Sequence, residues 1–142
     1  TAFCIEAFLN HSAPGLLSFW DDEVERTLSV HSKLNMICER LDVDLDSGRR
    51  PFQSFKCVMK YRNCLAHGKT EAISSTGHQV LKDGRRISYP DSWWEKHTTT
   101  RFAKQWLQDI EEIVTKLHDS AGLEGPAFGV HSWGLSDGKV ID

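Results

Sequence analysis

The 142-residue sequence lacks the paired cysteines and histidines that mark a metal site or a disulfide framework. None of its four cysteines forms a C-x-x-C pair, and its seven histidines show neither H-x-x-x-H nor H-E-x-x-H spacing. All four cysteines fall in segments that we predict to be helical: Cys4, Cys38, Cys57 and Cys64. We therefore expect buried, reduced thiols, with no metal and no cofactor.

Long hydrophobic runs are also missing. The longest uncharged stretch near the N-terminus covers residues 7–20 and contains Pro14, so it cannot cross a bilayer as a helix. No signal peptide is evident, although the chain begins at Thr1 rather than at a methionine, which leaves an upstream segment open. We expect a cytoplasmic protein that does not associate with a membrane.

The sequence has only a small net charge and no glycine-rich nucleotide-binding motif. It carries 17 basic and 20 acidic side chains, a net charge of -3, which argues against a basic protein that coats nucleic acid but allows a local basic patch. G-x-G-x-x-G, Walker A and G-x-S-x-G motifs are absent, so nucleotide hydrolysis and serine hydrolase chemistry have no support. Hydrophobic residues make up 39% and charged residues 26%, which is typical of one globular domain.

The spacing of apolar residues predicts an all-α domain over residues 1–120, a bundle of four or more helices. The first helix is expected over residues 1–11, ended by Pro14-Gly15, and the second over residues 23–41. The third is expected over residues 52–67, because Gly68 is the residue type that commonly follows a helix C-terminus.

The last helix and two less regular segments complete the predicted domain. The threonines at 98–100 are expected to cap an amphipathic helix that ends near His118. Residues 69–97 form a polar insertion, predicted to be irregular with a small β-hairpin at Asp83-Gly84. Residues 121–142 form a glycine-rich tail, packed on or extending from the same domain.

The third predicted helix places a charged side chain where an apolar one is expected. On a helical wheel its apolar residues fall within a stripe of about 140°, and Arg62 lies near the middle of that stripe. A guanidinium keeps its charge and brings five N–H donors that need partners. Arg62 must therefore have a buried carboxylate partner, or face a cleft or a second subunit where an anion binds.

Two polar residues follow Arg62 on the same helix. Asn63 and His67 are four residues apart and share a face, whereas Arg62 and His67 are five apart, about 140° around a regular helix. His67 lies on the last turn, where Gly68 lets the backbone turn away. Arginine binds phosphate oxygens and histidine transfers protons near neutral pH, so the group suits a phosphodiester substrate.

The motif Arg62-Asn63-x-x-x-His67 resembles the R-x4-6-H signature of HEPN domains, in which asparagine often follows the arginine. The segment Cys4-Ile-Glu-Ala-Phe-Leu-Asn10 is similar to the early helix of that family. The resemblance implies a HEPN-like helical bundle that dimerises so that two motifs face one cleft. Many such proteins are metal-independent endoribonucleases in toxin–antitoxin, abortive-infection or RNA-processing systems, and others only bind or scaffold.

The resemblance also implies roles for single residues. Arg62 would stabilise charge on the scissile phosphate, and Asn63 would orient His67 or the phosphate. His67 would act as general base on the 2′-hydroxyl or as general acid on the leaving oxygen, giving a 2′,3′-cyclic phosphate. Glu6 would pair with Arg62 in the resting state.

Further contacts follow from the same resemblance. Lys60, Tyr61 and Lys69 would contact flanking phosphates or stack on a base, and an antitoxin or other partner protein would bind the dimer. Two other interpretations stay open. Arg62 can be a structural ion-pair residue and His67 a simple helix C-terminal residue, in a catalytically silent dimeric domain that holds a partner protein or nucleotide. The chain can also be an unrelated helical interaction domain.

Overall fold

The computed structural model describes residues 1–44, 46–68, 72, 92–125 and 127. These residues are mostly helical and include no strand, which confirms the predicted all-α class. The predicted hairpin at Asp83-Gly84, residue Lys69 and most of the tail lie outside the described residues. The helices within them are α1 (Ala2–Leu16), α2 (Asp22–Thr27), α3 (Val30–Arg40), α4 (Phe52–His67), α5 (Trp93–His97) and α6 (Thr100–Ser120).

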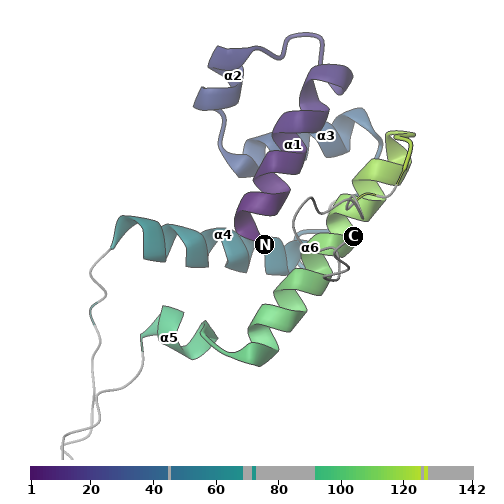
Figure 1. The fold of residues 1–142 in the computed structure, drawn as a ribbon. Helices are drawn as coiled ribbons and strands as arrows, with labels where there is room; N and C mark the ends of the chain where they lie inside the picture. Colours follow the sequence, from purple (N-terminus) through teal and green to yellow (C-terminus); the bar gives the residue numbers. More distant parts are fainter. Residues whose placement is uncertain (45, 69–71, 73–91, 126, 128–142) are drawn as a thin grey trace, which may run out of the picture.

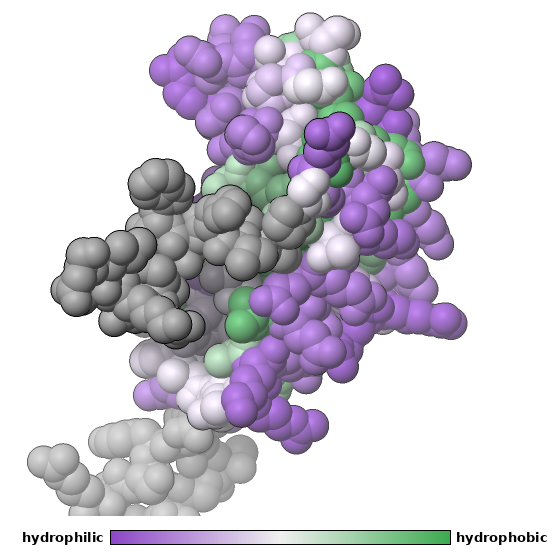
Figure 2. Space-filling model, turned by 45° about the vertical axis from the view of Figure 1, so that its right-hand side comes forward, coloured by the Kyte–Doolittle hydropathy of each residue, from purple (hydrophilic) through white to green (hydrophobic). Residues whose placement is uncertain are grey.

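The core lies where α1, α3, α4 and α6 meet. Helix α1 packs mainly on α3 and α4 mainly on α6, and α1 also reaches both α4 and α6 (Figure 1). On the face drawn in Figure 2, hydrophilic residues predominate and hydrophobic ones show in patches between them. This packing brings the start of α1 against the second half of α4. The buried side chains include Ile5, Leu9, Leu34, Ile37, Phe55, Val58, Ile110, Ile113, Val114 and Leu117.

Helix α1 is longer than predicted. Pro14-Gly15 was expected to end it, but the helix continues through Pro14 to Leu16. Proline lacks an N–H and so removes one helical hydrogen bond. The helix closes after it through the Leu17 N–H, which donates to the Ala13 carbonyl at 2.8 Å. One missing bond near the end of a helix is therefore tolerated.

The single helix predicted over residues 23–41 was wrong, because the chain forms two helices there. Helix α2 begins after Asp21, whose carboxylate accepts from the N–H groups of Glu23 and Val24. It stops at Thr27, and Ser29 then caps α3 by accepting from the Ser32 N–H. Serine is among the best N-cap residues, so a cap overrides the apolar spacing that runs across the break.

The third and last predicted helices are confirmed. Helix α4 ends at His67, and Gly68 follows in the left-handed conformation with φ 51°. Helix α6 begins after Thr99, whose hydroxyl accepts from the Phe102 N–H. The predicted irregular insertion is wrong at its C-terminal end, because Trp93–His97 forms the short helix α5.

A buried carboxylate on α6 is paired with the loop before α4. Asp109 is only 1% exposed and accepts three hydrogen bonds from the Arg50 guanidinium, at 2.5–3.1 Å. Burial alone raises the pKa of Asp109, but hydrogen bonds from Arg50 and Ser54 outweigh it and hold that pKa below its usual value. The pair fastens the start of α4 to the middle of α6.

The four cysteines are free and all lie in helices, as predicted, but only Cys38 is buried. Cys4 is exposed, and Cys57 and Cys64 are half-buried, because their helix faces are only partly covered. Cys38 is fully enclosed, and burial raises its pKa to about 12, although Lys116 lowers it slightly. The thiolate is the reactive form of cysteine. The thiol of Cys38 is therefore chemically silent in the folded protein.

We expect iodoacetamide at pH 8 to alkylate Cys4 in the native protein and to leave Cys38 unmodified until the chain is unfolded. Exposure favours the first reaction, and burial with a raised pKa blocks the second. Mass spectrometry of tryptic peptides, before and after guanidinium unfolding, measures both. Equal native labelling of Cys4 and Cys38 would contradict the packing of α3 described above.

Candidate functional site

The apolar face of α4 changes along its length from buried to exposed. Phe55 and Val58 are buried in the core, whereas Leu65 is 55% exposed and Ala66 is also exposed. The side chain of Arg62 lies at this transition and is 25% exposed. The second half of α4 thus extends past the core, and the predicted stripe faces the surface there.

Arg62 is held by three neighbours. Its Nη2 donates to the Glu6 carboxylate at 2.5 Å and its Nη1 donates to Asn63 Oδ1 at 3.0 Å. The guanidinium also lies over the ring of Phe3, 5.5 Å from its centroid. The Glu6 pair that the resemblance implies is therefore present. Among the described residues, these bonds occupy two of the five N–H groups of Arg62.

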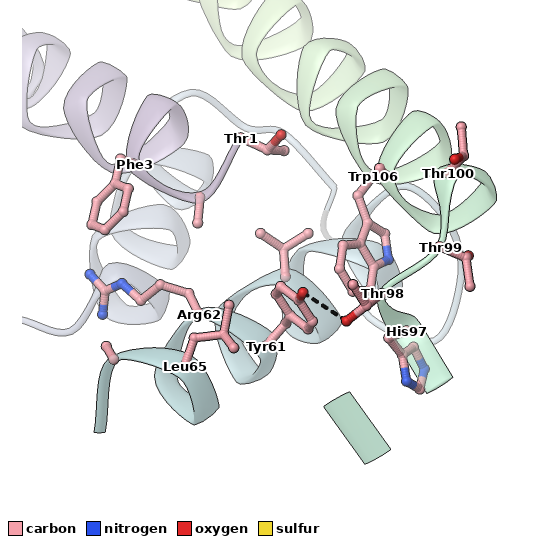
Figure 3. Close-up of a pocket in the computed structure, with 14 residues that line it drawn as sticks. Thr1, Phe3, Tyr61, Arg62, Leu65, His97, Thr98, Thr99, Thr100 and Trp106 are labelled. Atoms are coloured by element: carbon pink, nitrogen blue, oxygen red, sulfur yellow. Dashed lines mark hydrogen bonds between the residues drawn. The ribbon is translucent and has the colours of Figure 1, made fainter. Parts of the chain in front are cut away.

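A pocket of about 830 Å³ opens beside Arg62, between the start of α1, the second half of α4 and the α5–α6 junction. Its lining is mainly apolar, and Figure 3 shows Arg62 near Phe3 and Leu65 at one side, with His97 and Trp106 at the other. Tyr61 lies between the two sides. A cavity of this size and lining is typical of a binding site for a small molecule or part of a larger one.

An aromatic cluster of α4, α5 and α6 lies at this end of the pocket: Tyr61, Trp93, His97, Phe102 and Trp106. Three of its members line the pocket: Tyr61, His97 and Trp106. The His97 ring stacks on Trp93 at 4.2 Å and lies 4.6 Å from Phe102, and Tyr61 contacts Trp106 at 5.2 Å, measured between ring centroids. These contacts pack α5 against α4 and α6. The cluster therefore fixes one wall of the pocket.

The structure separates the residues of the predicted catalytic group. Arg62 lines the pocket, but His67 is exposed at the last position of α4 and does not line it. Asn63 was expected to orient His67 or the phosphate, yet its side-chain oxygen accepts from Arg62. Within one chain, Arg62, Asn63 and Glu6 therefore form one group and His67 stands apart.

Two residues expected to contact RNA already have partners inside the chain. The Lys60 ammonium lies 4.0 Å from the centroid of the Trp93 ring, and the Tyr61 hydroxyl bonds Thr98 Oγ1 at 3.0 Å. Both contacts hold α5 against α4. A contact of Lys60 or Tyr61 with RNA would therefore be made in addition to its role in packing α5 on α4.

Sequence reasoning missed the far side of the pocket, which His97 and Thr98–Thr100 supply. The overlooked signal is Ser92-Trp-Trp-Glu95. Ser92 accepts from the Glu95 N–H, and the Glu95 carboxylate accepts from the Ser92 N–H at 2.7 Å. This capping box marks a helix start and so predicts α5. Its approach to Arg62 depends on tertiary packing, which that motif does not encode.

Neither a metal site nor a membrane span is found in the described part of the chain. No group of three or more histidine, cysteine, aspartate or glutamate side chains there is arranged to hold a metal ion. No helix among the described residues is long and apolar enough to cross a bilayer. Comparison of the chain with protein-family models, with curated proteins and with solved structures gave no match.

Proposed function

We propose that this chain is a HEPN-like, metal-independent endoribonuclease that uses Arg62, Asn63 and His67, in the manner of a toxin, defence or RNA-processing effector. The observation that carries the proposal is the position of Arg62, partly exposed at an open pocket and with N–H groups to spare. Such a guanidinium can bind the oxygens of an RNA phosphate without first leaving Glu6.

The proposed reaction is attack of the ribose 2′-oxygen on the adjacent phosphorus. A base takes the 2′-hydroxyl proton, the bond from phosphorus to the 5′-oxygen breaks, and an acid gives a proton to the departing 5′-oxygen. The products are a 2′,3′-cyclic phosphate and a 5′-hydroxyl. Arg62, held by Glu6 and Asn63, stabilises the extra charge on the phosphate, and His67 transfers a proton.

The proposed site is shared by two copies of the chain. His67 does not line the pocket of its own chain, and the surface around Arg62 is flanked by exposed apolar residues, Phe3 at 71% and Leu65 at 55%. A second copy that covers this surface removes apolar area from water and can bring its own His67 to the cleft. The dimer is the arrangement that the HEPN resemblance implies.

A second candidate function is a catalytically silent HEPN-like domain that binds a partner protein or nucleotide. The ion pair with Glu6 favours it, because Arg62 already has one counter-charge, and so does the position of His67 outside the pocket. The two candidates differ in whether RNA is cut.

The wild-type protein is expected to cut single-stranded RNA in excess EDTA. Without a metal requirement the rate should match that in Mg²⁺, and the fragments should carry 2′,3′-cyclic phosphate and 5′-hydroxyl ends, read by mass spectrometry. RNA that stays intact in both buffers favours the silent domain. Cleavage that leaves 5′-phosphate ends contradicts the proposed chemistry.

The dimer is tested at Leu65, whose exposure makes a change there tolerable for the single chain. Leu65→Glu should reduce the solution mass from twice to once the 16.2 kDa chain and remove cleavage with it. Leu107→Glu is the matched control, since Leu107 is 47% exposed on α6 and does not line the pocket. Full cleavage by monomeric Leu65→Glu would contradict a shared site.

A further inference from the structure

The two sides of the pocket beside Arg62 offer different polar groups, hydrogen-bond donors at one side and acceptors at the other. Arg62 offers N–H donors and positive charge at one side. The other side is built from His97, Trp106 and the threonines at residues 98–100, as Figure 3 shows. The hydrogen bonds already made by Tyr61, His97 and Thr98 determine which polar atoms remain there.

The Tyr61 hydroxyl keeps its lone pairs. The Thr98 hydroxyl donates its one proton to the Trp94 carbonyl at 2.9 Å, because a carbonyl only accepts. In the 3.0 Å contact between Tyr61 Oη and Thr98 Oγ1, Tyr61 must therefore be the donor. Its oxygen is left as an acceptor at the pocket wall.

His97, like Tyr61, keeps one hydrogen-bond acceptor. Its Nδ1 lies 2.6 Å from the Trp93 carbonyl, so Nδ1 carries the proton. In the neutral ring Nε2 is then an acceptor, and it has no hydrogen-bond partner among the residues that the structure describes. Tyr61 and His97 therefore each keep one acceptor atom, and both residues line the pocket together with Arg62, the proposed phosphate ligand.

We infer that this pocket binds the nucleobase next to the phosphate held by Arg62, and that it favours adenine and cytosine, which carry an amino group where guanine and uracil carry a carbonyl oxygen. Adenine and cytosine present N–H₂ donors to Tyr61 Oη and His97 Nε2, whereas uracil presents carbonyl oxygens at the same positions. The apolar lining and the volume of about 830 Å³ suit a planar base with its ribose. The inference rests on the proposed function and adds a base preference to it.

The polar groups of the pocket favour a nucleotide over a purely apolar ligand. An apolar side chain or lipid tail fills the volume but leaves the spare N–H groups of Arg62 and the acceptor capacity of Tyr61 and His97 unused. A nucleotide satisfies both sides at once. The pocket is therefore assigned to a ligand that is anionic at one end and a hydrogen-bond donor at the other.

The test is calorimetric binding of AMP, CMP, UMP and ribose 5-phosphate, with RNA cleavage-site mapping beside it. AMP and CMP should bind at least tenfold more tightly than ribose 5-phosphate and several-fold more tightly than UMP. Tyr61→Phe keeps the ring but removes the acceptor, and should reduce the preference for AMP over UMP about five- to tenfold. Thr27→Val, a hydroxyl loss on α2 away from the pocket, is the control.

The outcomes separate this inference from the nuclease proposal. Base-dependent binding with intact RNA supports the pocket assignment and overturns the nuclease. Cleavage with no base preference, together with equal binding of all four ligands, overturns the pocket assignment and leaves the nuclease standing. Binding of decanoate with no nucleotide binding overturns the assignment in favour of an apolar occupant. An unchanged preference in Tyr61→Phe overturns the role given to its hydroxyl.

Discussion

Arg62→Ala is expected to lower the rate of RNA cleavage by about 10²–10³-fold while the protein keeps its helical content. The variant removes the charge that stabilises the phosphate in the transition state. Because Arg62 is partly exposed and its partner Glu6 can be hydrated, the fold should survive the change. Initial rates on a labelled RNA, with circular dichroism of the same samples, measure both effects.

Two controls distinguish a phosphate ligand from a structural ion-pair residue. Arg26→Ala removes an exposed arginine that bonds the Asp22 carbonyl within its own helix α2, and should cleave RNA at the wild-type rate. Glu6→Gln removes the counter-charge but leaves Arg62 in place, and should retain cleavage and bind RNA more tightly. If Glu6→Gln is as inactive as Arg62→Ala, the ion pair itself is what matters and Arg62 is not a phosphate ligand.

His67→Ala belongs to the same experiment. Loss of general acid–base catalysis lowers rates by about 10²–10⁴-fold. His67 is exposed at the end of α4, so the loss of activity should come without a loss of stability. His11→Ala, an exposed histidine on α1, is the matched control. Activity in His67→Ala equal to that of His11→Ala would remove His67 from the mechanism.

Arg50→Met is expected to destabilise the fold strongly, and to do so more as the pH rises. The substitution leaves the carboxylate of Asp109 buried without its partner. A buried charge left in this way costs about 3–5 kcal/mol, and the expected value lies near the lower end because Arg50 itself is half exposed. Urea unfolding at several pH values measures the free energy of unfolding.

The direction of the pH effect follows from the pKa of Asp109. In the wild type that pKa is lowered, so the pair stabilises the fold above the ordinary value near 4 and the stabilisation is lost as the pH falls through the lowered pKa. In Arg50→Met the Ser54 hydrogen bond remains, but burial is the larger effect and raises the pKa of Asp109, so the folded state prefers the protonated acid. The stability difference between the two proteins should therefore grow from pH 3 to pH 7.

The neighbouring residue provides the control for Arg50. Arg49 pairs with Asp46 on the surface, with their side chains 85% and 53% exposed. Exposed pairs contribute little, so Arg49→Met should change stability by less than about 1 kcal/mol at every pH. A pH-independent difference between Arg50→Met and the wild type would show that lost packing, and not the charge on Asp109, destabilises the variant.

Local signals predicted the elements that depend on a few adjacent residues. Proline before Phe52 and glycine after His67 bounded α4, and the threonines near residue 99 placed the start of α6. The break at Ser29 was missed because the apolar spacing continues across it, and spacing was given more weight than a cap.

The candidate site could be predicted only in part, because its parts come from distant segments. Arg62 stood out because a guanidinium in an apolar stripe requires a partner, and the Glu6 contact is present. The far wall of the pocket comes from α5 and α6, and no local pattern places His97 in the same pocket as Arg62. The Asn63 bond depends on which rotamer Arg62 adopts once Glu6 holds it.

The packing of α5 on α4 also affects which part of the sequence can tolerate insertions, deletions and substitutions. Lys60 over Trp93 and Tyr61 bonded to Thr98 hold the two ends of the segment between Gly68 and Ser92 to the same side of the molecule. In general, doubling the length of a chain segment between two fixed ends costs only about 0.6 kcal/mol in closure entropy. Changes in the number or identity of the residues between Gly68 and Ser92 are therefore expected to leave the pocket wall that faces Arg62 in place. Sequence divergence should be tolerated there more easily than in the helices.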